Sequence, residues 1–263
     1  MTTLQAVFEK ARAEDRAALV GYLPAGFPTK DGAVAAATAM VEGGCDVIEI
    51  GLPYSDPLMD GPTIQDAVHR SLTNGTRIAD VLRTVEQVAR TGAATLVMTY
   101  WNPVDRYGPE RFARDLASAG GAGTITPDLT PEEAGPWLEA SRAAGIDTVF
   151  LIAPSSTEER IARVVECCTG FVYAASLMGV TGTRDTVSAA AEGLVKRARA
   201  HTTLPICVGL GVSSGAQAAE VARYADGVIV GSAFIKRLLD APDEASGLAA
   251  VRALAEELAR GVR

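Results

Sequence analysis

The stretch VIEIGLPYSDPLMDGPTIQ, residues 47–65, joins a short apolar run to a loop built from turn formers. Val47, Ile48 and Ile50 are typical of a buried strand. Glu49 interrupts them with a carboxylate, which is rarely buried unless it is paired or functional. Because side chains alternate along a strand, Glu49 lies on the face opposite to the two isoleucines. The stretch therefore predicts an acid on the inner face of a buried strand.

Eight apolar runs rich in strand formers, most of them ending at or just before Gly, Pro or Ser, occur along the chain at 18–23, 46–52, 96–100, 123–127, 148–153, 171–176, 206–210 and 227–230. Helix-like stretches separate them, and the clearest of these carries one apolar face made of Ile78, Val81, Leu82, Val85 and Val88. Eight strand-helix alternations predict a (β/α)8 barrel.

The predicted barrel has an extra amphipathic helix at its N-terminus and an extra helix, 63–72, after the second strand. We expect residues 1–263 to form one domain, because no linker or low-complexity tract divides them. An open doubly wound sheet is the alternative, and it more often carries a Gly-rich dinucleotide turn after an early strand. The chain contains no GxGxxG.

Composition narrows the class of protein. The formal net charge of -8, from 24 basic and 32 acidic residues, argues against binding to nucleic acid. The four cysteines lack CxxC spacing, which favours a reducing cytoplasm, and we expect them to have no role beyond packing. No segment is long and apolar enough to span a membrane.

The acidic residues of the opening stretch are the candidates for catalysis. Burial in the barrel would raise the pKa of Glu49 and make it usable in either protonation state. Asp56 and Asp60 precede Pro and Gly, as in ordinary turns, but their loop follows a strand at the face where barrel enzymes build their sites. Three nearby carboxylates are alternatively a Mg²⁺ site.

Two Gly-rich strand ends point to a phosphorylated ligand. The first contains Gly209 and Gly211 after the seventh run, and the second contains Gly231 and Ser232 after the eighth. Barrels frequently hold a phosphate at these positions, on backbone N–H groups and a helix N-terminus. The alternative for any single glycine is that it merely allows a tight turn.

The sixth run supplies Tyr173 and is followed by a loop containing Gly179, Thr181 and Gly182. Glycines with this spacing suit a lid, whereas a lone Tyr173 would otherwise be interpreted as a packed aromatic residue. No histidine or lysine lies at a strand end facing the barrel mouth, which disfavours catalysis by His and a Schiff-base lysine. The chemistry that the sequence predicts is therefore acid/base catalysis by carboxylates on a phosphorylated small molecule.

The motifs IEIGLPYSDPLMDGPTIQ, GYLPAGFP, MTYWNP, TPDLTPEEA, FLIAPSST, GVTGTR, VGLGVSS and VGSAFIK, in this order, resemble those of the tryptophan synthase alpha subunit family. The resemblance covers essentially the whole chain, although Tyr54 stands where the family more often has Phe. It implies the reversible retro-aldol cleavage of indole-3-glycerol phosphate to indole and glyceraldehyde 3-phosphate.

The resemblance also implies roles for individual residues. Glu49 matches the general acid/base that protonates the indole ring, and Asp60 matches the carboxylate that accepts the indole N–H. Thr181 matches a lid threonine that positions the catalytic Asp. The other matched positions contact the substrate or its phosphate: Tyr173, Gly182, Leu210, Gly211, Gly231 and Ser232.

A beta subunit that carries pyridoxal phosphate is the partner that the resemblance implies, in an alpha2beta2 tetramer. The chain itself is expected to use no cofactor and no metal. Two alternatives stay open from the sequence: a free-standing lyase that releases indole, and a barrel that senses a phosphorylated ligand without chemistry. Retention of both Glu49 and Asp60 argues against the sensor.

Overall fold

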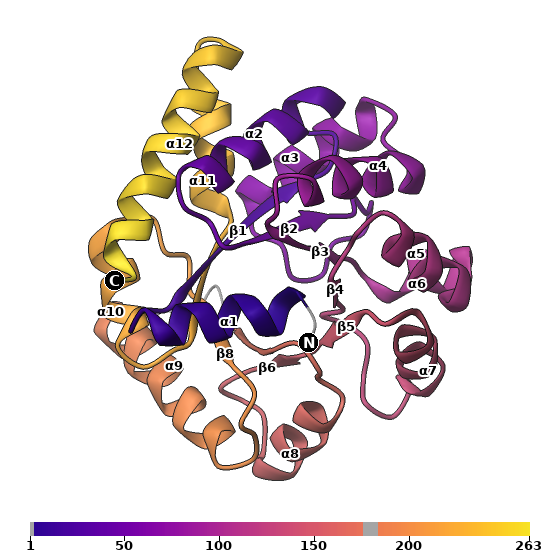
Figure 1. Cartoon of the computed structure of the whole chain (residues 1–263), viewed down its shortest axis with the longest axis vertical. Coiled ribbons are helices and arrows are strands. Elements are labelled where there is room, and N and C mark those ends of the chain that lie inside the picture. Colours follow the sequence, from indigo (N-terminus) through magenta and orange to yellow (C-terminus); the bar gives the residue numbers. More distant parts are fainter. Residues whose placement is uncertain (1–2, 176–183) are drawn as a thin grey trace.

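The strands of the chain form a ring, as a computed structural model covering residues 3–175 and 184–263 shows (Figure 1). In these residues, nine parallel strands pair in the order β5-β4-β3-β2-β1-β9-β8-β7-β6. β5 (Asp147–Val149) and β6 (Leu151–Ile152) are two halves of the predicted run 148–153, separated only by Phe150. Since β5 pairs with β4 and β6 pairs with β7, the sheet returns to its own first edge. The predicted (β/α)8 barrel is therefore confirmed over the open sheet.

The remaining strands are β1 (Ala18–Pro24), β2 (Val47–Gly51), β3 (Ala94–Met98), β4 (Gly123–Ile125), β7 (Val172–Ala175), β8 (Ile206–Gly209) and β9 (Gly227–Val230). They match the predicted runs closely, and the main shift is in β3, which begins at Ala94 instead of residue 96. It also ends earlier than predicted because Tyr100 already caps the helix that follows.

The helices are α1 (Thr3–Ala13), α2 (Lys30–Glu42), α3 (Pro62–Thr73), α4 (Ile78–Ala89), α5 (Trp101–Tyr107), α6 (Pro109–Ser118), α7 (Gly135–Ala144), α8 (Glu158–Glu166), α9 (Arg184–Arg199), α10 (Gly215–Ala222), α11 (Ser232–Asp240) and α12 (Glu244–Gly261). α1 and α3 are the two predicted extra helices. The division between α5 and α6 at Gly108, whose φ is 94°, was not predicted. No helix in the described ranges has the length and apolar character needed to cross a membrane.

Alternation along β2 sorts its side chains between two hydrophobic clusters. Val47 belongs to the cluster inside the barrel, whereas Ile48 and Ile50 belong to the cluster between strands and helices. Glu49 therefore faces the interior, and its neighbours in register are Tyr22 on β1 and Leu96 on β3.

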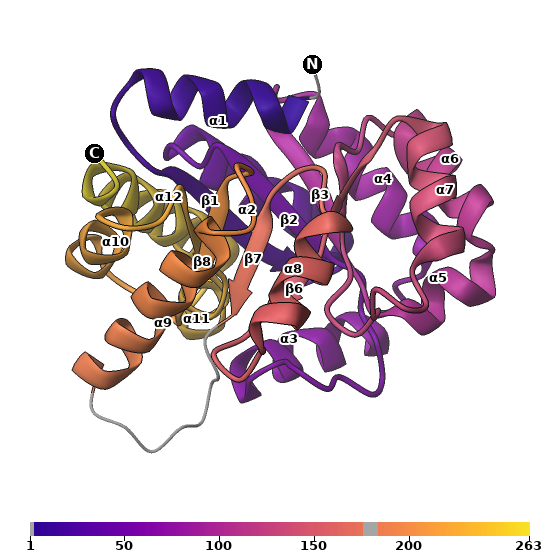
Figure 2. The ribbon, with the colours of Figure 1, turned by 90° about the horizontal axis from the view of Figure 1, so that it is seen from below.

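Helix α1 lies across the ring, at the end opposite to α3 (Figures 1 and 2). Its Leu4 and Phe8 are buried in the interior cluster, and the ring of Phe8 meets Phe171 edge-on with centroids 5.7 Å apart. α1 thus covers the amino-terminal ends of the strands. The loops that follow the strands lie at the opposite end, where β2 continues toward α3.

An ion pair beneath the barrel joins the segment after α1 to the start of β2. Arg16 donates to both oxygens of Asp46, at 2.7 Å from Nη1 and 2.8 Å from Nη2. Asp46 also accepts the backbone N–H of Leu19, at 2.9 Å. The side chains are only 7% and 15% exposed, so the pair fixes β1 beside β2 in an environment with little water.

We expect Arg16→Ala to lower the free energy of unfolding by about 3 kcal/mol, because it leaves the Asp46 carboxylate largely buried without its cation. Chemical denaturation at neutral pH measures the loss. Arg252→Ala is the control, since Arg252 pairs with Glu42 where both side chains are 53% exposed. That variant should lose less than about 1 kcal/mol, and equal losses in the two variants would contradict the interpretation.

Candidate active site

Glu49 is fully buried inside the barrel. Neither of its carboxyl oxygens has a hydrogen-bond partner among the residues that the structure describes. Burial raises its pKa from 4.5 to about 8, because the charged form is cut off from water. The group is therefore mostly protonated at neutral pH and is able to give or take a proton nearby.

A cavity of about 120 Å³ lies above Glu49 at the carboxyl ends of the strands. Residues from β1, β2, β3, β6, β7, β8 and β9 line it, together with residues of the following loops and of α3 and α11: Tyr22, Glu49, Met59, Asp60, Ile64, Met98, Leu151, Tyr173, Ala175, Gly209, Gly211, Ile229, Gly231 and Ser232. Much of the lining is apolar, and glycines line it where β8 and β9 end. Such a pocket suits a ligand with a flat apolar part and a polar tail.

Most of the predicted site residues meet at this cavity. Those that line it are Glu49, Asp60, Tyr173, Gly211, Gly231 and Ser232. Leu210 is not among the lining residues and instead packs, half-buried, against the core. Thr181 and Gly182 lie outside the described residues.

Asp60 reaches the cavity from the β2–α3 loop, residues 52–61, and is half-buried there. Burial raises its pKa, and the Tyr100 hydroxyl acts on the pKa in the opposite direction. The site thus contains two different acids, one enclosed in the barrel and one at its mouth. That contrast is typical of a pair of groups with separate tasks in proton transfer.

Asp56 lies apart from this pair. Its side chain is exposed and accepts a hydrogen bond from the Ser55 hydroxyl at 2.6 Å, as expected of a turn residue. Within the described ranges, no three His, Cys, Asp or Glu side chains form a group suited to a metal ion. The interpretation of Glu49, Asp56 and Asp60 as a three-carboxylate Mg²⁺ site finds no support in this arrangement.

Tyr22 is a lining residue that the sequence reasoning missed. It lies directly across from Glu49 in the β1–β2 register. Burial is the main cause that raises the pKa of its phenol well above the usual range, so the hydroxyl stays protonated as a hydrogen-bond donor. Its position on the inner face of the first strand was the available signal.

Two glycines give the cavity tyrosines their space. A Cβ atom at Gly51 would lie 2.4 Å from the Tyr22 hydroxyl, and one at Gly209 would lie 2.5 Å from the Tyr173 hydroxyl. Each tyrosine therefore lies over a glycine of the neighbouring strand. For these two positions the close approach of a ring, and not a turn, explains the glycine.

The loops after β8 and β9 form the other end of the cavity. Gly211 has a φ of +65°, a conformation that favours glycine. Gly231 caps α11, which begins at Ser232. The first N–H groups of a helix have no earlier carbonyl to bind, and together with the helix dipole they attract an anion. A phosphate is well matched to this end.

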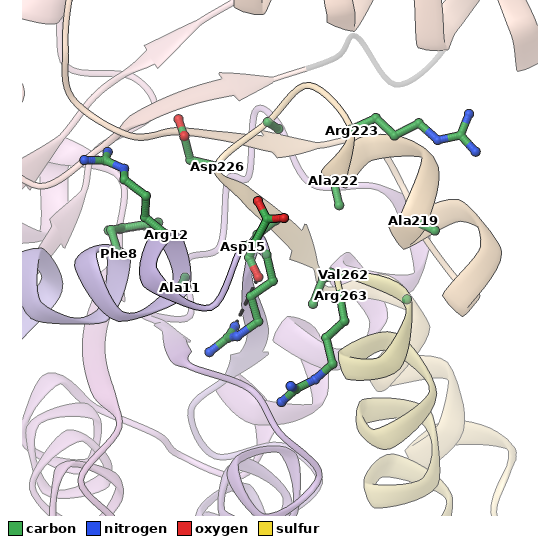
Figure 3. A pocket seen from close by; sticks show the side chains of 14 residues that line it. Phe8, Ala11, Arg12, Asp15, Ala219, Ala222, Arg223, Asp226, Val262 and Arg263 are labelled. Carbon is green, nitrogen blue, oxygen red and sulfur yellow. Dashed lines mark hydrogen bonds between the residues drawn. The ribbon is translucent and has the colours of Figure 1, made fainter.

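A larger cavity, of about 400 Å³, lies at the opposite end of the barrel beside α1 (Figure 3). Arg12, Arg223 and Arg263 contribute to its lining, and their side chains point in different directions. These residues lie at the C-terminal ends of α1, α10 and α12. Cations at helix C-termini offset the negative end of the helix dipole, which accounts for them without a ligand.

All four cysteines are buried free thiols, and burial raises the pKa of each. Such thiols are poor nucleophiles. The acids of the barrel cavity are therefore the groups best suited to catalysis.

Comparison with known proteins agrees with this geometry. The family model described as "Tryptophan synthase alpha chain" matches residues 8–263. The tryptophan synthase alpha chain of Thermobifida fusca is 62% identical over 266 residues, which cover 100% of this chain and 98% of the relative. That of Streptomyces avermitilis is 61% identical over 254 residues, covering 96% and 92%.

Solved structures give the same result. A crystal structure of tryptophan synthase from M. tuberculosis in an aminoacrylate-bound form superposes with a TM-score of 0.92 at 54% identity, with 100% of both chains covered. Tryptophan synthase subunit alpha from Legionella pneumophila superposes with a TM-score of 0.91 at 33% identity, covering 100% of this chain and 98% of that one. The chain belongs to the tryptophan synthase alpha chain family.

Proposed function

We propose that Glu49 and Asp60 are the two groups with which this chain carries out the reaction of its family. The chain is a lyase that cleaves indole-3-glycerol phosphate to indole and glyceraldehyde 3-phosphate, and it supplies the indole to a beta subunit in tryptophan biosynthesis. The observation that carries the assignment of Glu49 is a fully buried carboxyl group on the cavity wall without a hydrogen-bond partner in the described residues.

Glu49 transfers the proton that the reaction requires. The indole C3 gains a proton, the bond from C3 to the glycerol side chain breaks, and its electron pair returns to the ring. The side-chain hydroxyl loses its proton and becomes the carbonyl of glyceraldehyde 3-phosphate. A carboxyl group whose pKa is about 8 is suited to both proton transfers near neutral pH.

Asp60 stabilises the charge that develops on the indole. Protonation at C3 makes the ring nitrogen positive, and a carboxylate beside its N–H stabilises the transition state more than the ground state. Ile64 and Met98, which line the same cavity, offer apolar surface to the ring. Tyr22 and Tyr173 face the substrate from β1 and β7.

The phosphate binds at the other end, against Gly211, Gly231 and Ser232. The N-terminus of α11 attracts the phosphate without a lysine or arginine in the cavity lining, within the described residues. We place Thr181, Gly182 and Leu210 in the same proposal by resemblance alone.

The partner of the chain is the beta subunit, and we propose an alpha2beta2 tetramer in the cytoplasm. Leu58 and Met59, in the loop directly before Asp60, are 79% and 47% exposed, and Met59 also lines the cavity, which supports docking through this face. The buried free thiols support a reducing compartment. We also propose that residues 1–263 act as one barrel domain.

Indole release from indole-3-glycerol phosphate tests this function. We expect slow release by the chain alone and faster release with a beta subunit, whereas a free-standing lyase would be fast and indifferent to the partner. Glu49→Gln keeps the size of the side chain but cannot transfer the proton, so turnover should be lost while binding of an uncleavable analogue, indole-3-propanol phosphate, remains. An active variant would remove Glu49 from the mechanism.

The stability of the protein should depend on pH through Glu49. In the unfolded chain this carboxyl ionises near pH 4.5 and in the folded protein near pH 8, so between these values the folded protein holds one more proton. The free energy of unfolding of the wild type should therefore fall, relative to Glu49→Gln, by up to about 1.4 kcal/mol per pH unit across that window. Denaturation curves from pH 5 to 8 measure the difference, and a constant difference would exclude titration of Glu49 there.

A negative charge at the start of α11 should weaken substrate binding. Ser232→Asp places a carboxylate where we propose the phosphate binds, and we expect KM to rise about tenfold or more through like-charge repulsion. Thr157→Asp is the control, because Thr157 caps α8 by accepting the N–H of Arg160 and does not line the cavity. An equal KM in Ser232→Asp and wild type would move the phosphate site elsewhere.

A further inference from the structure

The Tyr100 hydroxyl, just after β3, binds the loop that carries Asp60. It accepts the backbone N–H of Leu58 at 3.0 Å and that of Met59 at 2.9 Å. These are the two residues directly before Asp60. One phenol oxygen therefore fixes the backbone next to this acid, and Tyr100 itself is buried and held as the residue that caps α5.

The two N–H groups determine where the phenol proton goes. A tyrosine hydroxyl accepts hydrogen bonds at its oxygen and has one proton to donate. Leu58 and Met59 both donate to this oxygen, so the remaining role of the hydroxyl is that of a donor. The Asp60 carboxyl, on the next residue of the loop, is the acceptor that this proton would reach, and the Tyr100 phenol opposes the effect of burial on the pKa of Asp60.

A second hydroxyl ties the same loop to the same neighbouring segment. The Asn102 amide donates to the Tyr54 hydroxyl at 3.0 Å, and the rings of Tyr54 and Tyr100 lie 5.5 Å apart. Tyr54 has no such link to the Asp60 side chain in the described residues. It therefore offers a matched comparison, because the same chemical group joins the same two segments from the side of the loop.

The charged and titratable groups around this contact are few. The charges of Asp60 and Asp128 raise the pKa of the Tyr100 phenol, and Asp128 itself accepts the backbone N–H of Trp101 at 2.9 Å. On the cavity side, the charge of Asp60 also raises the pKa of Tyr22 and of Tyr173, the two phenols that face Glu49. Of these groups, Tyr100 is the one whose hydroxyl accepts the backbone N–H groups directly before the acid.

We propose that Tyr100 is a positioning residue for the lyase reaction: it fixes the β2–α3 loop through two backbone N–H groups and aims the Asp60 carboxylate with its own proton. Tyr100 does not line the cavity above Glu49 and need not touch the substrate. The catalytic consequence rests on the proposed function of Asp60, whereas the fixing of the loop does not.

Tyr100→Phe tests the proposal in the full-length chain, with and without the beta subunit. We expect kcat to fall about 10- to 100-fold, as for a displaced catalytic group, with a much smaller change in KM because the charge on the indole nitrogen develops only in the transition state. Loss of the hydrogen bond should also raise the pKa of Asp60 and move the acidic limb of the pH–rate profile to higher pH. Tyr54→Phe should keep the wild-type limb.

Amide hydrogen exchange of Leu58 and Met59 provides a readout that needs no activity. Both amides should exchange faster in Tyr100→Phe than in the wild type and in Tyr54→Phe, at equal thermal stability. Wild-type exchange and a wild-type acidic limb in Tyr100→Phe would overturn the proposal, as would equal losses of rate and stability in both variants. If the wild type releases no indole, the proposed function fails, while the exchange rates still decide whether Tyr100 fixes the loop.

Discussion

A carboxyl group enclosed in a barrel is the constraint on which the rest of the structure depends. Glu49 is stable there as a neutral acid, because no cation lines its cavity in the described residues. Keeping water out requires a complete ring of strands and a closed floor. The split strand at Phe150 completes the ring, and Phe8 of α1 packs into the floor.

Strand β2 shows how one short segment meets several demands at once. Val47 packs in the interior, Ile48 and Ile50 pack against the helices, Glu49 supplies the acid, and Gly51 leaves room for the Tyr22 ring. A shift of the register by one residue would exchange the two faces and expose the acid to the helices. The bidentate contact of Arg16 with Asp46, just before β2, opposes such a shift.

The fold was predictable because its signals are local and repeated. Eight apolar runs and the helical stretches between them needed no knowledge of distant contacts, and Glu49 was found from alternation within a single strand. The break at Phe150 was not predictable, since it depends on how β4 and β7 pair with one strand from two sides.

The site was predictable only in part, for a physical reason. Asp60 was taken from a turn-like loop with the help of a resemblance, because nothing in its own neighbours says that a tyrosine 40 residues later binds that loop. Tyr22 was missed because an aromatic residue in a strand is most often packing. Contacts between segments far apart in the sequence decide both cases.

The closed floor restricts the end of the barrel at which substrate enters and products leave. With α1 and the interior apolar cluster beneath Glu49, the route into the cavity from the amino-terminal end is filled. Substrate and both products would therefore pass through the opposite end, where Met59 lines the cavity. A subunit bound at that end would therefore control the order in which indole and the triose phosphate leave. Both products would leave through one opening of the barrel, and the neighbouring subunit would form part of its rim.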